Sequence, residues 1–155
     1  MGILGRQDKA SDWRYVVTFS LDDQSYAVPI ESVIKITQVS AMIPSPHPES
    51  NVAGWIQIEQ RRIPAVNMRR HHGLTEMALE PHTPVIVLQI DETVLALIVD
   101  KLSGAVRVPA ALITRSSEGL SGTVMQTPQG STLLVNLENL FTPEQMKAFT
   151  NLKTG

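Results

Sequence analysis

Cysteine is absent from the 155 residues of this sequence, and so are long apolar runs. Without cysteine the chain has no disulfide, no catalytic thiolate and no cysteine-ligated zinc, which fits a reducing compartment. No stretch of about 18 apolar residues could span a bilayer, and the N-terminus lacks the apolar region of a signal peptide. We therefore expect a cytoplasmic protein.

Basic and aromatic residues are also scarce. Lysine and arginine number 13 against 15 acidic residues, which gives a formal net charge of −2, and 5% of the residues are aromatic. Binding of nucleic acid requires clustered cations for the phosphates or aromatic rings for the bases. Only Arg61-Arg62 and Arg69-Arg70 form basic pairs, so we expect no nucleic-acid partner.

The residues that commonly carry chemistry form no recognisable motif. His71 and His72 are adjacent, so on a helix their rings diverge by about 100°, whereas zinc ligands on one helix face need wider spacing. Glycines are scattered, and the acidic pairs Asp22-Asp23 and Asp91-Glu92 fall at predicted hairpin tips exposed to solvent. We expect no catalytic residue, no metal and no cofactor, because an enzyme would need a converging polar pocket.

Short strand patterns, in contrast, are abundant, and the densest lies in residues 83–108. Two apolar runs, Val85–Leu88 and Val94–Val99, flank a polar reversal at Asp91–Thr93, and alternation resumes at Val106 and Val108. This pattern predicts three consecutive antiparallel strands that form a core rather than a site.

Similar patterns on both sides of this core suggest how the chain is divided. Residues 1–12 are polar and predict a flexible lead-in, whereas residues 13–155 predict a single domain. Within it we expect about ten strands, half of them in a subdomain over residues 13–70 and half in a second over residues 83–137. Short strands with turn residues between them favour small barrels or a sandwich.

The C-terminal helix, expected over residues 143–153, has explicit start signals. Thr142 is placed to cap its N-terminus, Pro143 suits the first helical position, and Gln145 completes a capping box. Phe141 is placed to pack against Met146 across the cap. Such a cap contributes about 1 kcal/mol, so the sequence fixes the helix start well.

Several blocks of the sequence, taken in order, resemble those of the CheW family of chemotaxis coupling proteins. The blocks are YVVTFSLDDQSYAVPIESV, GWIQIEQRRIPAVNMR, TPVIVLQIDETVLALIVDKL and LLVNLENLF, with a proline-rich segment after the first. The resemblance implies an all-β protein of two five-stranded SH3-like barrels with a C-terminal helix. It also implies a non-enzymatic adaptor, recruited to the inner face of the membrane, that couples the cytoplasmic tips of chemoreceptors to the regulatory domain of a CheA-type histidine kinase.

The resemblance further implies two partner-binding surfaces. The receptor contact of the family lies in a groove between the barrels, and the matching positions are Val33, Lys35, Gly54, Ile56, Glu59, Ala96 and Ala105. Gly54 would allow close approach of a partner helix or would simply open a strand, and the two alanines would leave room for a partner or pack in the core. The kinase-facing surface is expected at Arg61, Arg62 and Asp100.

Two departures from the family pattern bear on the partners. Lys35 stands where the family usually has an acid, and Glu59 stands where it usually has arginine. If the two positions face each other, they would form an ion pair of reversed sign; otherwise they are unrelated surface charges. Asn67, where the family commonly has Asp, is a further departure. The alternative to the standard adaptor is a divergent CheW-like scaffold that serves a different chemosensory-type kinase pathway.

Overall fold

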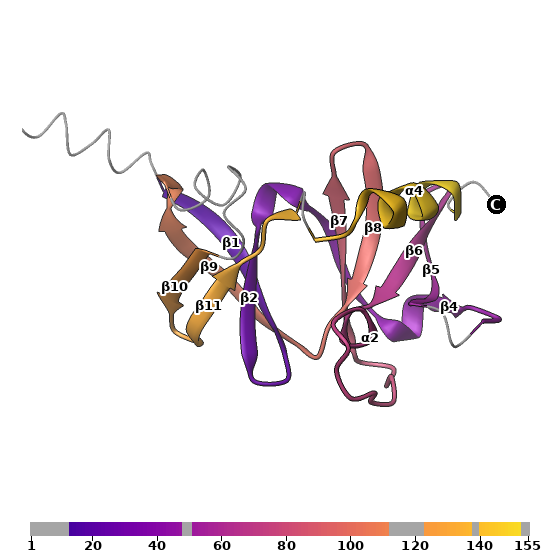
Figure 1. Cartoon of the computed structure of the whole chain (residues 1–155), viewed down its shortest axis with the longest axis horizontal. Coiled ribbons are helices and arrows are strands. Elements are labelled where there is room, and N and C mark those ends of the chain that lie inside the picture. The colour runs from indigo at the N-terminus through magenta and orange to yellow at the C-terminus, as the bar shows by residue number, and fades with distance from the viewer. Residues whose placement is uncertain (1–12, 48–50, 112–122, 138–139, 153–155) are drawn as a thin grey trace, which may run out of the picture.

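The computed structural model describes residues 13–47, 51–111, 123–137 and 140–152, and within them the chain forms two curled β-sheets side by side (Figure 1). The first sheet has five strands in the order β10-β11-β2-β1-β9. They are β1 (Trp13–Leu21), β2 (Gln24–Pro29), β9 (Lys101–Pro109), β10 (Thr123–Thr127) and β11 (Gly130–Leu134). The expected lead-in, residues 1–12, lies outside the described residues.

The second sheet has six strands in the order β3-β7-β8-β6-β5-β4. They are β3 (Val33–Gln38), β4 (Met42–Pro44), β5 (Val52–Ile58), β6 (Arg61–Asn67), β7 (Pro84–Ile90) and β8 (Thr93–Ile98). Short helices join the strands: η1 (Ile30–Ser32), η2 (Val39–Ala41) and α2 (Met68–His71). The all-β prediction is confirmed, with one strand more in the second sheet because β4 adds a short edge strand.

The division of the strands between the two sheets differs from the one expected along the sequence. The first sheet takes its strands from both ends of the chain, and the second takes β3 to β8 from the middle. Boundaries at 13–70 and 83–137 are therefore wrong for the sheets. The predicted third strand of the central core, β9, pairs with β1 instead of β8. β8 has no free edge for it, since β7 and β6 already occupy both sides.

Apolar residues on one face of the central strands β7 and β8 hold the two sheets together, and those on the other face form a core within the second sheet. Along β7, Ile86 and Leu88 face a core shared by the two sheets, and Val85 and Val87 face a separate core within the second sheet. β8 alternates in the same way. This double burial explains why β7 and β8 are continuous apolar runs rather than alternating ones.

The C-terminal helix α4 (Pro143–Leu152) begins where its signals predict. The Gln145 main-chain N–H donates to Thr142 Oγ1 at 3.1 Å, and the Thr142 N–H donates to Gln145 Oε1 at 2.9 Å, which completes the capping box. Phe141 and Phe149 both lie in the shared core, with their ring centroids 5.0 Å apart. The helix lies over β8 (Figure 1) and closes one side of that core.

Candidate protein-interaction surfaces

The edge strand β3, which holds Val33 and Lys35 of the expected receptor surface, also carries two exposed isoleucines that the sequence did not single out. Ile34 and Ile36 are 45% and 43% exposed, and Lys35 between them is exposed as well. Among the described strands, β3 ends the second sheet and pairs with β7 alone, and its register shifts between Val33 and Lys35. Large apolar side chains that remain in solvent on a sheet edge are a feature of protein-binding surfaces.

Of the two alternatives for Lys35 and Glu59, the structure favours unrelated surface charges over an ion pair of reversed sign. Both side chains lie in the described part of the chain, and no ion pair within 4.0 Å joins them. Glu59 lies in the exposed turn between β5 and β6 with a φ of 54°, whereas the neighbour of β3 is β7. Lys35 is therefore a solvent-facing cation without a partner within the described chain.

Gly54 is a close-approach glycine, but the approaching group belongs to its own chain. A Cβ at this position would lie 2.3 Å from the Ile43 carbonyl oxygen and 2.7 Å from Met42 Cγ. The short strand β4 passes directly over Gly54, and Pro44 pairs with it. The missing Cβ thus allows β4 to join the sheet. This contact explains why glycine stands at position 54 without a partner helix.

Two further positions of the expected receptor groove are buried. Ile56 is 2% exposed and Ala96 is fully buried, both within the core of the second sheet. Their side chains pack against other strands and offer no surface to a partner. Val33 is half-buried against the shared core, and Ala105 on β9 is exposed. The accessible remainder of the expected set is therefore Val33, Lys35, Glu59 and Ala105.

An aromatic patch on the first sheet was not predicted from the sequence. Trp13 and Tyr15 on β1 are 39% and 53% exposed, and the guanidinium of Arg107 on β9 lies 4.5 Å from the centre of the Trp13 ring. Tyr15 pairs with Arg107, and Ala105 pairs with Val17 on the same two strands. Only the β1–β9 pairing, which the sequence does not reveal, brings these side chains together.

The three residues expected to face the kinase do not share one surface. Arg61 and Arg62 are exposed at the start of β6, where Arg62 lies 5.2 Å from the centre of the Trp55 ring. β6 runs parallel to β8, and Asp100 follows the far end of β8. Arg61 and Asp100 therefore lie at opposite ends of these two strands. Six or more residues separate them along the strand direction, which at about 3.3 Å per residue is roughly 20 Å.

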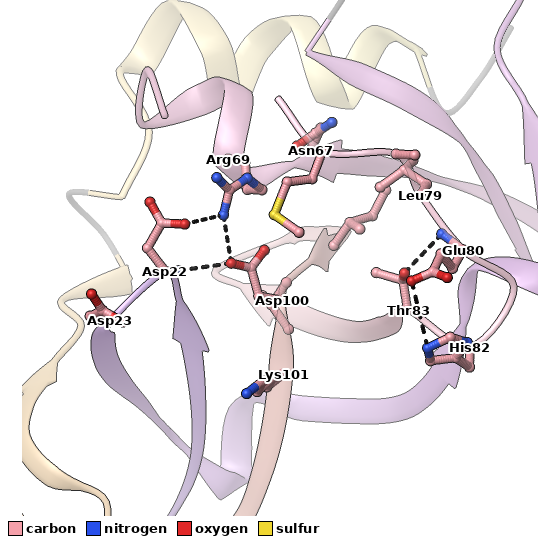
Figure 2. A pocket seen from close by; sticks show the side chains of 14 residues that line it. Asp22, Asp23, Asn67, Arg69, Leu79, Glu80, His82, Thr83, Asp100 and Lys101 are labelled. Atoms are coloured by element: carbon pink, nitrogen blue, oxygen red, sulfur yellow. Dashed lines mark hydrogen bonds and ion pairs between the residues drawn. The ribbon is translucent and has the colours of Figure 1, made fainter. Parts of the chain in front are cut away.

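A groove of about 700 Å³ lies at the end of the sheet where β8 stops. Its walls come from the β1–β2 turn, the segment between α2 and β7, and the crossover from β8 to β9; Figure 2 shows the side chains around it. Met77 and Leu79 are among its apolar walls, and Asp22, Asp23 and Glu80 are among its acidic ones. No sequence pattern predicted this groove, because its walls are distant along the chain.

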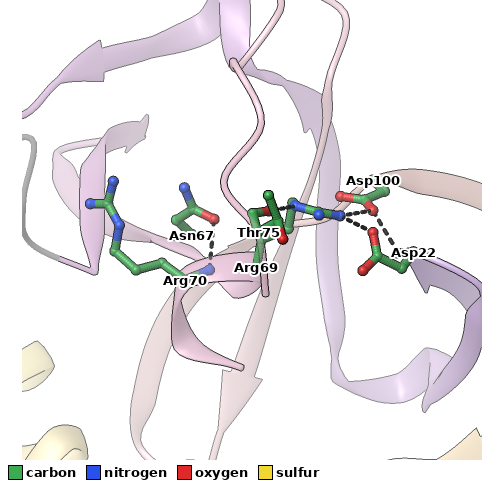
Figure 3. A network of polar contacts seen from close by, with 6 residues as sticks. All are labelled: Asp22, Asn67, Arg69, Arg70, Thr75 and Asp100. Atoms are coloured by element: carbon green, nitrogen blue, oxygen red, sulfur yellow. Dashed lines mark hydrogen bonds and ion pairs between the residues drawn. The ribbon is translucent and has the colours of Figure 1, made fainter. Parts of the chain in front are cut away.

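Arg69 forms one wall of this groove and ties the two sheets together (Figure 3). Its side chain is 8% exposed, and Nη1 donates to Asp22 Oδ1 at 2.5 Å and to Asp100 Oδ2 at 2.6 Å. Nε donates to the Thr75 carbonyl at 2.7 Å. The hydrogen bond to Asp22, supported by Asp100, raises the pKa of Arg69 against the effect of burial. This contact network stabilises the junction of the sheets.

The short helix α2 also contacts the C-terminal segment. His71 Nε2 lies 3.0 Å from the Leu140 carbonyl oxygen, and the His71 ring packs on Phe141 with centroids 4.6 Å apart. Burial, followed by the proximity of His71, lowers the pKa of His72. His71 thus links α2 to the chain before α4, whereas the His72 ring lies 5.9 Å from the Tyr26 ring on β2.

Comparison with known proteins identifies the family to which this chain belongs. The family model of the CheW-like domain matches residues 15–145. The chain belongs to the CheW family. The chemotaxis protein CheW of Treponema pallidum is 26% identical over 151 residues, covering 88% of this chain and 87% of that protein. The chemotaxis protein CheW of Helicobacter pylori is 22% identical over 116 residues, covering 75% and 70%.

A solved structure shares the fold of this CheW-like chain. The crystal structure of the scaffolding protein TtCheW from Thermoanaerobacter tengcongensis superposes with a TM-score of 0.66 at 16% identity, covering 83% of this chain and 92% of that one. Within the described residues, no helix is both long and apolar enough to cross a membrane.

Proposed function

We propose that this protein is a non-enzymatic adaptor that couples chemoreceptor cytoplasmic tips to the regulatory domain of a CheA-type histidine kinase. The observation that carries the proposal is the match of the CheW-like domain to residues 15–145, on a fold shared with a scaffolding protein. In this role the protein is cytoplasmic and is recruited to the inner face of the membrane by the receptors.

The receptor-binding surface of this adaptor is centred on β3. Ile34 and Ile36 supply apolar area to a receptor helix. Lys35, which the register places on the opposite face of the strand from Ile36, supplies a charge that selects for an acidic residue on the receptor. Val33, Glu59 and Ala105 remain part of the proposed surface because their side chains are at least partly accessible. Gly54, Ile56 and Ala96 act indirectly, by shaping the sheet that presents β3.

The kinase-binding surface of the adaptor includes Arg61 and Arg62 on β6. Both side chains are exposed, and the planar guanidinium of Arg62 over Trp55 presents a rigid cation to an acidic partner surface. Asp100, in contrast, serves the Arg69 network at the other end of the sheet.

The reversed charge at Lys35 favours a second candidate within the same class. A cation on β3 where the family usually has an acid fits a CheW-like scaffold that serves a different chemosensory-type kinase, whose receptors carry the complementary charge.

The two candidates are separated by a co-sedimentation experiment. Membranes that contain chemoreceptors from the same genome are mixed with the CheA-type kinase of the chemotaxis pathway, with and without this protein. A coupling adaptor should increase the amount of kinase that sediments with the membranes. Kinase that sediments equally in both samples would contradict the first candidate. The second candidate predicts the increase only with the kinase and receptors of another chemosensory pathway.

A further inference from the structure

The groove beside Arg69 has an excess of negative charge. Four carboxylates line it, against the two permanent cations Arg69 and Lys101. Arg69 is already engaged by Asp22 and Asp100. Asp23 has no ion-pair partner within 4.0 Å among the described residues, so its carboxylate is available to a ligand.

Glu80 supplies a second accessible carboxylate in the groove. The Glu80 side chain is 65% exposed, and Oε1 lies 3.9 Å from Nε2 of the exposed His82. Such an exposed contact constrains the carboxylate little. Asp23 and Glu80, which lie on opposite sides of the groove in Figure 2, are therefore two separate carboxylates that no described cation neutralises fully.

Asn67 provides an independent sign of a ligand. The residue is 8% exposed and lines the groove. Its Oδ1 accepts from the Arg70 main-chain N–H at 3.2 Å and caps α2, but Nδ2 has no acceptor in the described part of the chain. Buried amide donors are nearly always paired. An acceptor that enters the groove would satisfy this one.

Apolar side chains complete the groove. Met77 is 60% exposed, and Leu79 lines the same wall. Methionine is flexible and adapts to varied apolar partners. The groove thus combines acidic groups, a buried amide donor and apolar area, and a single small cation cannot contact all three.

We propose that this groove binds a segment of another protein that carries lysine or arginine. The cation of the segment lies beside either Asp23 or Glu80, a main-chain carbonyl accepts a hydrogen bond from Asn67 Nδ2, and neighbouring apolar side chains pack on Met77 and Leu79. The surface is separate from β3, so the adaptor has a further docking site beyond those of its proposed function.

The test uses capped tripeptides, so it does not depend on any chemotaxis partner. ¹⁵N-labelled protein is titrated with N-acetylated, C-amidated Leu-Arg-Leu, and with Leu-Glu-Leu as the control. We expect the arginine peptide to shift the Asn67 side-chain amide and the groove residues, and the glutamate peptide to leave them unchanged. No shift with a large excess of Leu-Arg-Leu, or equal shifts with both peptides, would overturn the proposal.

A charge variant locates the binding site. Asp23→Asn with Glu80→Gln leaves the Arg69 network intact and should weaken binding of Leu-Arg-Leu roughly tenfold. Glu31→Gln with Glu92→Gln removes the same charge from exposed residues in η1 and the β7–β8 turn. This control should change the affinity much less. Equal weakening by the two double variants would show attraction by net charge alone and would overturn the assignment to the groove.

Asn67→Asp tests the hydrogen bond. Aspartate keeps the acceptor that caps α2 but replaces the Nδ2 donor by a second acceptor. We expect weaker binding of Leu-Arg-Leu, although the variant adds a negative charge. Tighter binding would overturn the role of Asn67 as a donor to the peptide.

Discussion

Ile36 and Ile86 lie opposite each other on neighbouring strands, yet one is 43% exposed and the other is fully buried. Ile86 lies on β7, which has a partner strand on each side, and its side chain packs in the core shared by the sheets. Ile36 lies on β3 at the end of the sheet. The comparison teaches that position in the sheet, rather than residue type, separates the scaffold of this protein from the surface available to partners.

The largest expected effect follows from removing the buried member of this pair. Ile86→Ala should lower the free energy of unfolding by about 2–5 kcal/mol, because it leaves a cavity in the shared core. Ile36→Ala is the matched control and should lower the free energy of unfolding much less, since the Ile36 side chain is already 43% exposed. Urea unfolding measures both changes, and similar losses would remove the distinction between the two strands.

The next largest loss of stability is expected at the opposite edge of the second sheet, where β4 pairs with β5. Gly54→Ala places a methyl group against the Ile43 carbonyl of β4, and we expect a loss of about 1–3 kcal/mol from this overpacking. Gly130→Ala is an unsuitable control, because its φ of 93° strains any side chain. Ala53→Gly on the same strand is preferable. A Gly54→Ala protein as stable as the wild type would show that β4 does not close over Gly54.

Two adjacent arginines extend the comparison to charged groups. Arg69 is buried between two carboxylates, whereas Arg70 pairs with Glu76, whose side chain is 65% exposed. Exposed pairs contribute roughly 0.2–1 kcal/mol, so Arg70→Met should have a small effect. Arg69→Met should lower the free energy of unfolding several times more than Arg70→Met, because Asp22 and Asp100 lose their shared hydrogen-bond donor. Equal unfolding midpoints for the two variants in urea would contradict the role assigned to Arg69.

The smallest expected effect concerns Lys35 and Glu59. Because no ion pair joins them, the stability changes of Lys35→Glu and Glu59→Lys should add to within about 0.3–0.5 kcal/mol in the double variant. A thermal or urea unfolding cycle provides the measurement. A coupling energy clearly above this range would restore the reversed ion pair.

Local signals in the sequence predicted most of the individual elements. The turns at Asp22 and Asp91 adopt positive φ angles of 53° and 55° between the expected strands, and the capping box of Thr142 and Gln145 forms as predicted. These features depend on residues that are close along the chain. The shared core was also anticipated by the apolar runs of β7 and β8.

Pairing between distant strands could not be predicted in this way. After Asp100 the chain crosses to the first sheet, where β9 pairs with β1. This crossover occurs because β6 and β7 already pair with both edges of β8. The positions matched to the family located Lys35 on an accessible strand but did not reveal that Ile56 is buried. For Ala96, packing in the core was one of the two expected alternatives, and the structure confirms it. Arg69 and the groove beside it were missed because their contacts join segments far apart in the sequence.

The proposal that β3 binds the receptor is tested most directly by calorimetric titration of a chemoreceptor tip into wild-type protein and the Lys35→Glu variant. Lys147→Glu, an exposed site on α4, is the matched charge control. We expect Lys35→Glu to weaken binding by about tenfold with no change in the unfolding midpoint, and Lys147→Glu to bind like the wild type. Wild-type affinity in the Lys35→Glu variant would contradict the account.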